Sequence, residues 1–224
     1  MRRFLKEQSL SIVFLLLFLG ALAGQAIAGH ADFNEQQVRH GDPTMTMGRY
    51  VVSSEFGVDV MENWQSEYLQ FTLFILLTVW LLQRGSPESK ELDKAGLESD
   101  EQQKVGKYAQ QNSPRWAKVG GIRTTIYSNS LLIVMGAIWL ATWFAQSVAG
   151  RVQYNSELLD HHTHPVSWLA YLGKPDFWSR TLQNWQSEFL AVGSMAILAV
   201  YLRQRGSPES KPVGAPHGST GTEG

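Results

Sequence analysis

One segment of 28 residues occurs twice in the chain, and this repeat constrains the fold more than any other feature. The first copy runs from Asn63 to Lys90 and the second from Asn184 to Lys211. Aligned without a gap, the copies agree at 17 of 28 positions, mostly at their ends, which read Asn-Trp-Gln-Ser-Glu and Gln-Arg-Gly-Ser-Pro-Glu-Ser-Lys. An apolar run separates these ends. Each copy therefore predicts an apolar helix with defined ends.

The same shift of 121 residues relates two further apolar runs. Leu10–Ala28 falls on Leu131–Ala149, and a helix of this length covers about 28 Å, enough to cross a bilayer. A basic start, an apolar centre and Ala26-Ile-Ala28 before Gly29 also fit a cleaved signal peptide. Because the counterpart run is internal, we favour a retained helix and keep the signal peptide as the alternative.

Small residues recur at every fourth position of both runs. They are Gly20, Gly24 and Ala28 in the first run, and Ala141, Ala145 and Ala149 in the second. Such a stripe lets two helices approach closely in lipid. The alternative is chance, since Ala and Gly are common in membrane helices. A packing role predicts that Gly24→Leu loosens the fold.

Together these patterns predict an all-α, four-helix integral membrane protein. Its two tandem two-helix hairpins have the same orientation, unlike the inverted repeats of many transporters. Aromatic residues that match across the shift, such as Tyr50 and Tyr171, predict ordered structure in the hairpin loops. The predicted parts are a first membrane hairpin repeat at 1–90, a charged cytoplasmic linker at 91–121, a second hairpin at 122–211 and a disordered tail at 212–224.

Positive charges predict the orientation of the hairpins. Eight Lys and Arg residues lie between Arg84 and Arg123, others flank the outermost helices, and the hairpin loops hold few. Lys and Arg favour the cytoplasmic side, so both termini and the linker are predicted there. A formal net charge of −1 gives no electrostatic case for nucleic acid, and the absence of cysteine excludes disulfides, thiolate metal sites and a Cys nucleophile.

The Asn-Trp-Gln-Ser-Glu end of each copy has a structural and a functional interpretation. Asn63 and Asn184 are predicted N-caps, and Glu67 and Glu188 suit the positive end of a helix dipole. The neighbouring Trp residues then form an aromatic anchor at the headgroups. In the functional interpretation, Glu67 and Glu188 meet at the outer membrane face as a paired carboxylate site for a proton or a cation.

The other end of each copy predicts a helix stop at the inner face. Arg84 and Arg205 would complement the negative helix end, the following Gly can adopt a left-handed cap, and Pro cannot continue the helix. A stop needs fewer residues than the repeated Gly-Ser-Pro-Glu-Ser-Lys string provides. This excess predicts a contact between the two cytoplasmic ends, or with a partner.

A histidine-rich stretch in the second outer loop is the remaining candidate site. His161, His162 and His164 follow Asp160, and His with carboxylate suits zinc. Because the spacing fits no closed metal motif, we favour a solvent-facing loop and predict no metal and no cofactor. Phosphate-loop, nucleophile-elbow and metalloprotease motifs are absent from the sequence, so the protein is predicted not to be an enzyme.

The repeated strings resemble those of a family of uncharacterised bacterial multi-pass membrane proteins, a domain of unknown function. The resemblance covers Arg3 to Pro212 and implies only a bacterial inner-membrane setting, with the lipid bilayer as partner. We therefore expect a structural or accessory envelope component. One alternative is a small transport or permeation protein that uses Glu67 and Glu188, as a homodimer because four helices line a pathway poorly. The other alternative is an outer-face metal sensor.

Overall fold

A computed structural model describes residues 2–222 and places them in α-helices, short 3₁₀ turns and connecting segments. The predicted all-α class is confirmed for these residues, which contain no strand. The chain divides into two compact units. The first unit comprises Met1–Met61 and Ala145–Leu172, and the second comprises Glu62–Phe144 and Gly173–Gly224. Each unit therefore combines segments from both halves of the chain.

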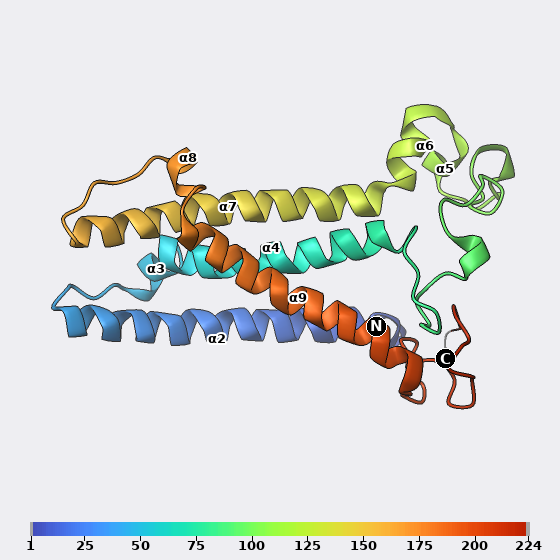
Figure 1. Ribbon diagram of the computed structural model, residues 1–224, viewed down its shortest axis with the longest axis horizontal. Helices are drawn as coiled ribbons and strands as arrows, with labels where there is room; N and C mark the ends of the chain where they lie inside the picture. Colours follow the sequence, from blue (N-terminus) through green and yellow to red (C-terminus); the bar gives the residue numbers. More distant parts are fainter. Residues whose placement is uncertain (1, 223–224) are drawn as a thin grey trace. The chain divides into compact units, whose positions relative to one another are not determined.

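Four long helices carry most of the chain (Figure 1). They are α2 (Ser9–His40), α4 (Ser54–Leu77), α7 (Ser130–Asp160) and α9 (Pro175–Tyr201). The shorter elements are α1 (Arg2–Glu7), α3 (Met47–Tyr50), η1 (Leu92–Lys94), η2 (Gly106–Tyr108), α5 (Arg115–Lys118), α6 (Gly121–Ser128) and α8 (Trp168–Tyr171).

In the first unit, α2 begins where the apolar run predicts but ends at His40 instead of Ala28. The added turns are polar and contain helix-stabilising pairs four residues apart, Gln36 with Asp32 and Arg39 with Glu35. The helix stops at Gly41, whose φ of 82° is left-handed and whose N–H donates to carbonyl oxygens of the last turn. Helix α7 extends to Asp160 in the same way. Both hairpin loops are therefore shorter than the polar segments of the sequence predict.

Two asparagines hold the segments that follow α2 and α7. The side chain of Asn34 accepts from the Met45 N–H at 2.7 Å and donates to the Met45 carbonyl at 2.9 Å. Asn155 does the same with Val166, at 2.8 and 3.0 Å. In each case the chain turns back along its helix before the short helix α3 or α8 (Figure 1). These matched contacts are separated by 121 residues.

Tyr50 and Tyr171 anchor the two short helices of the first unit. Both are buried, with exposed fractions of 3% and 1%. The Tyr50 ring packs on Phe33 and the Tyr171 ring on Tyr154, at centroid distances of 5.8 and 5.5 Å. Burial raises the pKa of Tyr50, and the nearby carboxylates add to this. The ordered loop structure predicted from matched aromatics is therefore confirmed at this pair.

Close helix packing through small residues occurs between α4 and α7. In the first unit, a Cβ built on Gly57 would lie 3.8 Å from the Cβ of Ala149, and in the second, one built on Gly136 would lie 3.7 Å from Thr72. By contrast, no described atom lies within 4 Å of a Cβ built on Gly20 or Gly24. The prediction that Gly24→Leu loosens the fold therefore finds no packing contact to support it.

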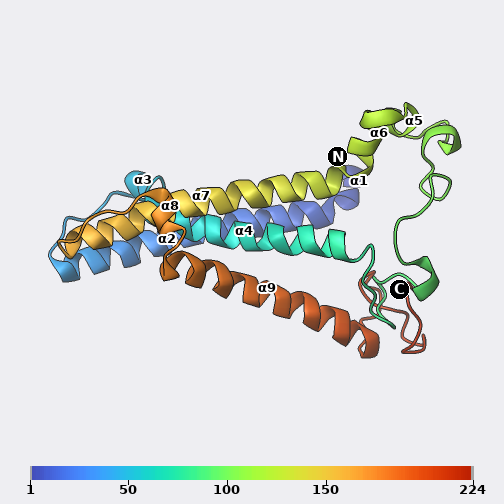
Figure 2. The same ribbon diagram turned by 45° about the horizontal axis from the view of Figure 1, so that its top comes forward.

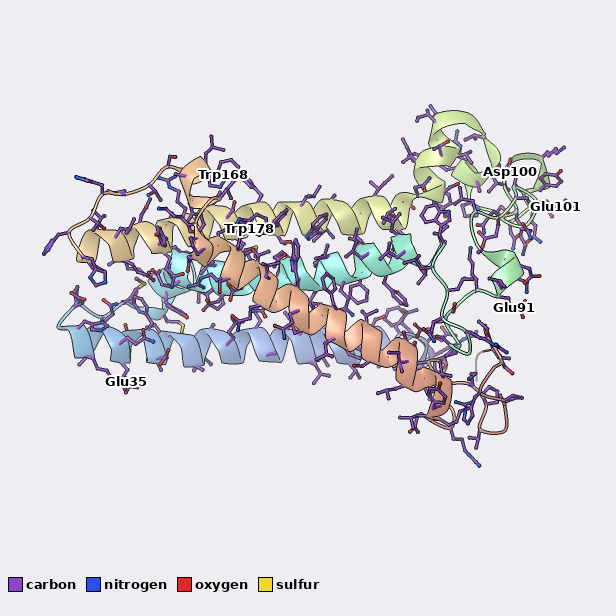
Figure 3. The ribbon with its side chains drawn as sticks, viewed as in Figure 1. Glu35, Glu91, Asp100, Glu101, Trp168 and Trp178 are labelled. Atoms are coloured by element: carbon purple, nitrogen blue, oxygen red, sulfur yellow. The ribbon has the colours of Figure 1, made fainter. Side chains whose placement is uncertain are left out.

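In the second unit, α9 starts beside α4 and α7 and diverges from α4 toward its C-terminal end (Figures 1 and 2). The linker between α4 and α6 is irregular apart from η1, η2 and α5. Its acidic side chains Glu91, Asp100 and Glu101 project outward (Figure 3). This agrees with a solvated segment.

Two of the described helices, α2 and α7, are long and apolar enough to cross a membrane. Helix α4 carries Glu55, Asp59 and Glu62 in its first half and Glu67 just past its midpoint, and neither α4 nor α9 is apolar enough over the same length. Membrane association thus has weak support from length and composition alone.

Candidate functional site

The Asn-Trp-Gln-Ser-Glu motifs lie inside helices, not at their starts. Asn63 and Asn184 follow the first turns of α4 and α9, and the Asn184 side chain donates to the Arg180 carbonyl at 2.9 Å. The predicted N-cap role is therefore wrong. Helix α4 begins after Ser53, whose hydroxyl accepts from the Phe56 N–H, and α9 begins with Pro175 at its first position. These upstream signals start the helices earlier.

A buried polar contact joins the two copies of the motif. The indole N–H of Trp185 on α9 donates to Gln65 Oε1 on α4 at 2.8 Å. Gln65 is fully buried and its amide nitrogen donates to the Glu62 carbonyl at 3.1 Å. Trp185 thus binds the neighbouring helix, and the predicted anchor at the headgroups stays a prediction. The tryptophan of one copy and the glutamine of the other act as an interhelical link.

The candidate carboxylates Glu67 and Glu188 lie in the same region of the second unit. Glu188 accepts a hydrogen bond from the Ser66 hydroxyl at 3.4 Å, and Ser66 directly precedes Glu67 on α4. Ser66 is buried, Glu188 is half-buried and Glu67 is exposed. The arrangement brings two acidic groups together beside a hydroxyl, as a proton or cation site requires, but Glu67 faces outward.

An interhelical ion pair joins the same two helices. Arg180 on α9 pairs with Glu62 on α4 and with Asp176 on its own helix, each at 3.4 Å. The side chains of Arg180 and Glu62 are 28% and 18% exposed, so the pair is partly shielded from solvent. Sequence comparison of the two halves missed it because the shift pairs Arg180 with Asp59 and Glu62 with Gln183. The i,i+4 spacing of Asp176 and Arg180 was the available signal.

An aromatic cluster packs against the same part of α9. It is centred on Trp143 of α7, whose indole N–H also donates to Thr181 at 3.4 Å. The Trp143 ring lies 5.6 Å from Trp185 and 5.8 Å from Trp139. Phe177 and Trp178 complete the cluster at 6.1 and 6.2 Å. Aromatic packing and the polar links together hold α4, α7 and α9 in the second unit.

The Gln-Arg-Gly-Ser-Pro-Glu-Ser-Lys strings form the same turn twice. In the first, the Ser89 hydroxyl accepts from the Gln83 N–H at 2.9 Å; in the second, Ser210 accepts from Gln204 at 2.9 Å. Gly85 and Gly206 are both left-handed, with φ of 86° and 82°. Each hydroxyl closes the turn that its string forms, which explains why the string is longer than a helix stop.

The lysine of each string holds the chain that follows it. Lys90 donates to the Gly96 carbonyl at 2.9 Å and also pairs with Glu98. The hydrogen bond from Lys90 to the Glu98 carboxylate holds the pKa of Glu98 below its usual value. Lys211 is 1% exposed and donates to the carbonyls of Pro216, His217 and Ser219. Burial and, secondarily, the charge of Arg203 lower the pKa of Lys211.

The segment after Lys211 contacts the first string. The Gly85 N–H donates to Thr220 Oγ1 at 2.9 Å, and the Gly221 N–H donates to the Ser86 carbonyl at 3.1 Å. The sequence predicts disorder for 212–224, whereas in the structure the described part, to Thr222, is tied back by these bonds and by Lys211. These bonds join the tail to the first string, and the contact predicted between the two strings themselves stays a prediction.

Alanine substitutions at Gly85 and Gly206 should have different effects on the turns that the two strings form. Both residues are left-handed, which costs an L-residue about 1–2 kcal/mol. Only at Gly85 would the new Cβ also collide with the His217 carbonyl, and at Gly206 the space is open. We expect Gly85→Ala alone to release the tail, measured as faster amide hydrogen exchange at 217–221. Equal exchange in both variants would contradict the tail contact.

The candidate arginines do not cap the helices. Arg84 and Arg205 are exposed within the turns, beyond the ends of α4 and α9. The last carbonyls of α9 are instead bound by Arg203, whose Nη1 donates to Ala199, Val200 and Leu202. The predicted cap at the end of α9 is therefore correct in chemistry but wrong in residue.

The histidine-rich stretch ends α7. His162 is left-handed, with φ of 56°, and its N–H donates to the Leu159 carbonyl at 2.9 Å. It occupies the place of Gly41 after α2, so it serves as the helix C-cap. His161 and His164 are exposed beside it. The described residues contain no group of three His, Asp or Glu side chains placed to hold a metal ion.

His162→Gly is expected to stabilise the protein by about 0.5–1 kcal/mol, because Gly adopts the left-handed cap without the steric cost of a side chain. Denaturant unfolding in detergent would measure the gain, with the exposed neighbour His164→Gly as the control. A loss of stability in His162→Gly would show that the imidazole makes a contribution of its own.

Comparison with known proteins places these features in a family. No curated protein and no solved structure matches the chain. A family model described as a domain of unknown function, DUF6766, matches residues 1–222. The match includes both copies of the repeat, the linker and the tail. The chain therefore belongs to the DUF6766 family.

Proposed function

We propose that this protein is a non-enzymatic membrane protein of the bacterial inner membrane, and a structural or accessory component of the envelope. Its four long helices cross the bilayer as two tandem hairpins produced by internal duplication, with both termini in the cytoplasm. The observation that carries the proposal is α2, a 32-residue helix whose apolar window is wholly unburied. Leu15, Leu16 and Leu17 are 56%, 64% and 62% exposed, which lipid tolerates and water does not.

Helix α7 supplies the internal counterpart. A signal sequence explains an apolar helix near the N-terminus equally well, but α7 begins at Ser130 and passes the same test of length and composition. Three of the four acidic residues of α4 lie in its first half, where Glu62 pairs with Arg180, and Glu67 follows just past the midpoint. The last turns, Leu69–Leu77, are largely apolar. Paired charges near one end of a helix are compatible with a membrane span.

The polar groups of the second unit favour a structural role. Glu62, Gln65 and Glu188 each bind a residue on the neighbouring helix, so they join α4 to α9. The transport alternative rests on Glu188, which contacts Ser66 directly before Glu67. Proton and cation flux into liposomes separates the two: transport requires flux that Glu67→Gln with Glu188→Gln abolishes, and the structural role predicts none above empty vesicles.

The topology is testable with single cysteines because the chain contains none. Asp42→Cys and His164→Cys place a thiol in each hairpin loop, and Glu101→Cys and Gly214→Cys place one in the linker and the tail. All four positions are exposed. We expect a membrane-impermeant maleimide to label the loop positions in intact spheroplasts, and the other two only after permeabilisation.

Two results would overturn the proposal. Release of the protein from membranes by alkaline carbonate would exclude integral insertion. Labelling of Glu101→Cys in intact spheroplasts would exclude the four-span topology, since the linker then lies outside. The permeabilised sample serves as the control for thiol reactivity.

A further inference from the structure

We propose that the second unit binds a phospholipid with a primary-amine headgroup, phosphatidylethanolamine, in the groove between α4 and α9. This inference rests on the proposed membrane insertion of both helices. The groove has a volume of about 860 Å³, within the range of small-molecule sites. Its walls are apolar, with Phe74, Leu77 and Leu81 on one side and Val192, Met195 and Ala199 on the other.

One end of the groove is polar and is built by the two repeated strings. Gln83, Ser86 and Ser89 come from the first string, and Glu88 and Glu209 hold the same position in the two strings. The apolar walls suit acyl chains, the amide and hydroxyl groups suit a phosphate, and the two carboxylates suit the ammonium group of the headgroup.

The charge around the groove favours an ammonium group. Of the described residues that line it, two are acidic and none is basic. The lysines of the same strings are occupied elsewhere, Lys90 with Gly96 and Glu98, and Lys211 with three carbonyls. The lysine of each string therefore binds the segment that follows the string, and the glutamate of each string lines the groove. A primary ammonium also donates hydrogen bonds to carboxylates, which a choline group cannot.

Ser86 supplies a hydroxyl at the polar end of the groove. The residue lines the groove and is 5% exposed. A phosphate oxygen of the bound lipid would accept a hydrogen bond from this hydroxyl. Its repeat counterpart, Ser207, instead accepts from the Glu209 N–H at 3.2 Å and does not line the groove.

Native mass spectrometry of the full-length protein, released from detergent with dioleoyl phosphatidylethanolamine, phosphatidylcholine or phosphatidylglycerol, tests the proposal. We expect binding of the ethanolamine lipid to be about fivefold tighter than that of the choline lipid, as one surface ammonium–carboxylate contact allows, and the glycerol lipid to bind more weakly still. Glu88→Gln with Glu209→Gln should remove this preference. Asp100→Asn with Glu101→Gln removes the same charge from the linker and should retain it.

A groove-filling variant completes the test. No described atom lies within 4 Å of a Cβ built on Gly193, which lines the groove, so Gly193→Leu should fold and lose binding of all three lipids. Equal affinity of the wild-type protein for the three lipids would overturn the proposal. A dimer that carries no bound lipid would also overturn it, because a second copy of the chain would then occupy the groove. If the protein inserts into membranes but shows no headgroup preference, only this inference fails. If carbonate releases the protein, the proposed function fails as well.

Discussion

Trp143→Ala is expected to lower the free energy of unfolding by about 3–5 kcal/mol, the usual cost of truncating a large packed aromatic side chain. Trp143 contacts four aromatic rings and donates to Thr181, so its removal leaves a cavity at the junction of α7 and α9. Under the proposed membrane insertion, the lost packing contacts are the main cause, because apolar burial contributes little in lipid.

Denaturant unfolding in detergent, followed by far-UV circular dichroism, would measure this loss without relying on tryptophan emission. Leu140→Ala is a matched control because Leu140 lies on the same helix and is 55% exposed. We expect a change below about 0.5 kcal/mol for the control. Comparable losses in the two variants would contradict the packing role of the cluster.

The sequence predicts the helices better than it predicts their ends. The apolar runs correctly place the starts of α2 and α7 near Leu10 and Leu131. The polar segments after Ala28 and Ala149 read as loops because hydropathy changes there, although both continue as helix. Helical propensity and i,i+4 pairs such as Arg39 with Glu35 stabilise these polar turns. The length of the apolar run alone does not reveal them.

The N-caps show how a strong local signal can mislead. Asn63 and Asn184 are good capping residues at the start of a repeated motif, but Ser53 and Pro175 begin the helices earlier. Once the helix is established upstream, the motif side chains are free to bind the neighbouring helix, as Trp185 does with Gln65. Such a contact joins residues 120 apart and depends on tertiary packing that periodicity cannot predict.

The repeated strings were partly predictable. Left-handed Gly85 and Gly206 follow from their residue type, whereas the extra length of each string forms the turn that Ser89 or Ser210 closes. The bonds from Lys211 to the carbonyls of Pro216, His217 and Ser219 use backbone groups, which any sequence provides. The ion pair of Glu62 with Arg180 has no counterpart across the shift, so a search for matched residues overlooks it.

Gly150→Ala is expected to destabilise the protein by about 1–3 kcal/mol, although alanine normally favours a helix over glycine by about 1 kcal/mol. The new Cβ would lie 2.5 Å from the Tyr171 hydroxyl oxygen, and Tyr171 is 1% exposed and cannot move away freely. Gly29 stands in the same relation to Tyr50, so Gly29→Ala should lose stability as well.

Gly24→Ala is the control in the same unit, because it should leave stability unchanged or raise it. Its Cβ would meet open space, so thermal unfolding in detergent should show an unchanged or higher midpoint, whereas Gly150→Ala should show a lower one. Tyr171→Phe removes the nearest atom and leaves ring carbon Cζ at 3.2 Å, so Gly150→Ala should cost less in that background. A Gly150→Ala protein as stable as Gly24→Ala would show that α7 and α8 do not pack this closely. Purely additive losses would instead show that the hydroxyl is not the group that the alanine meets.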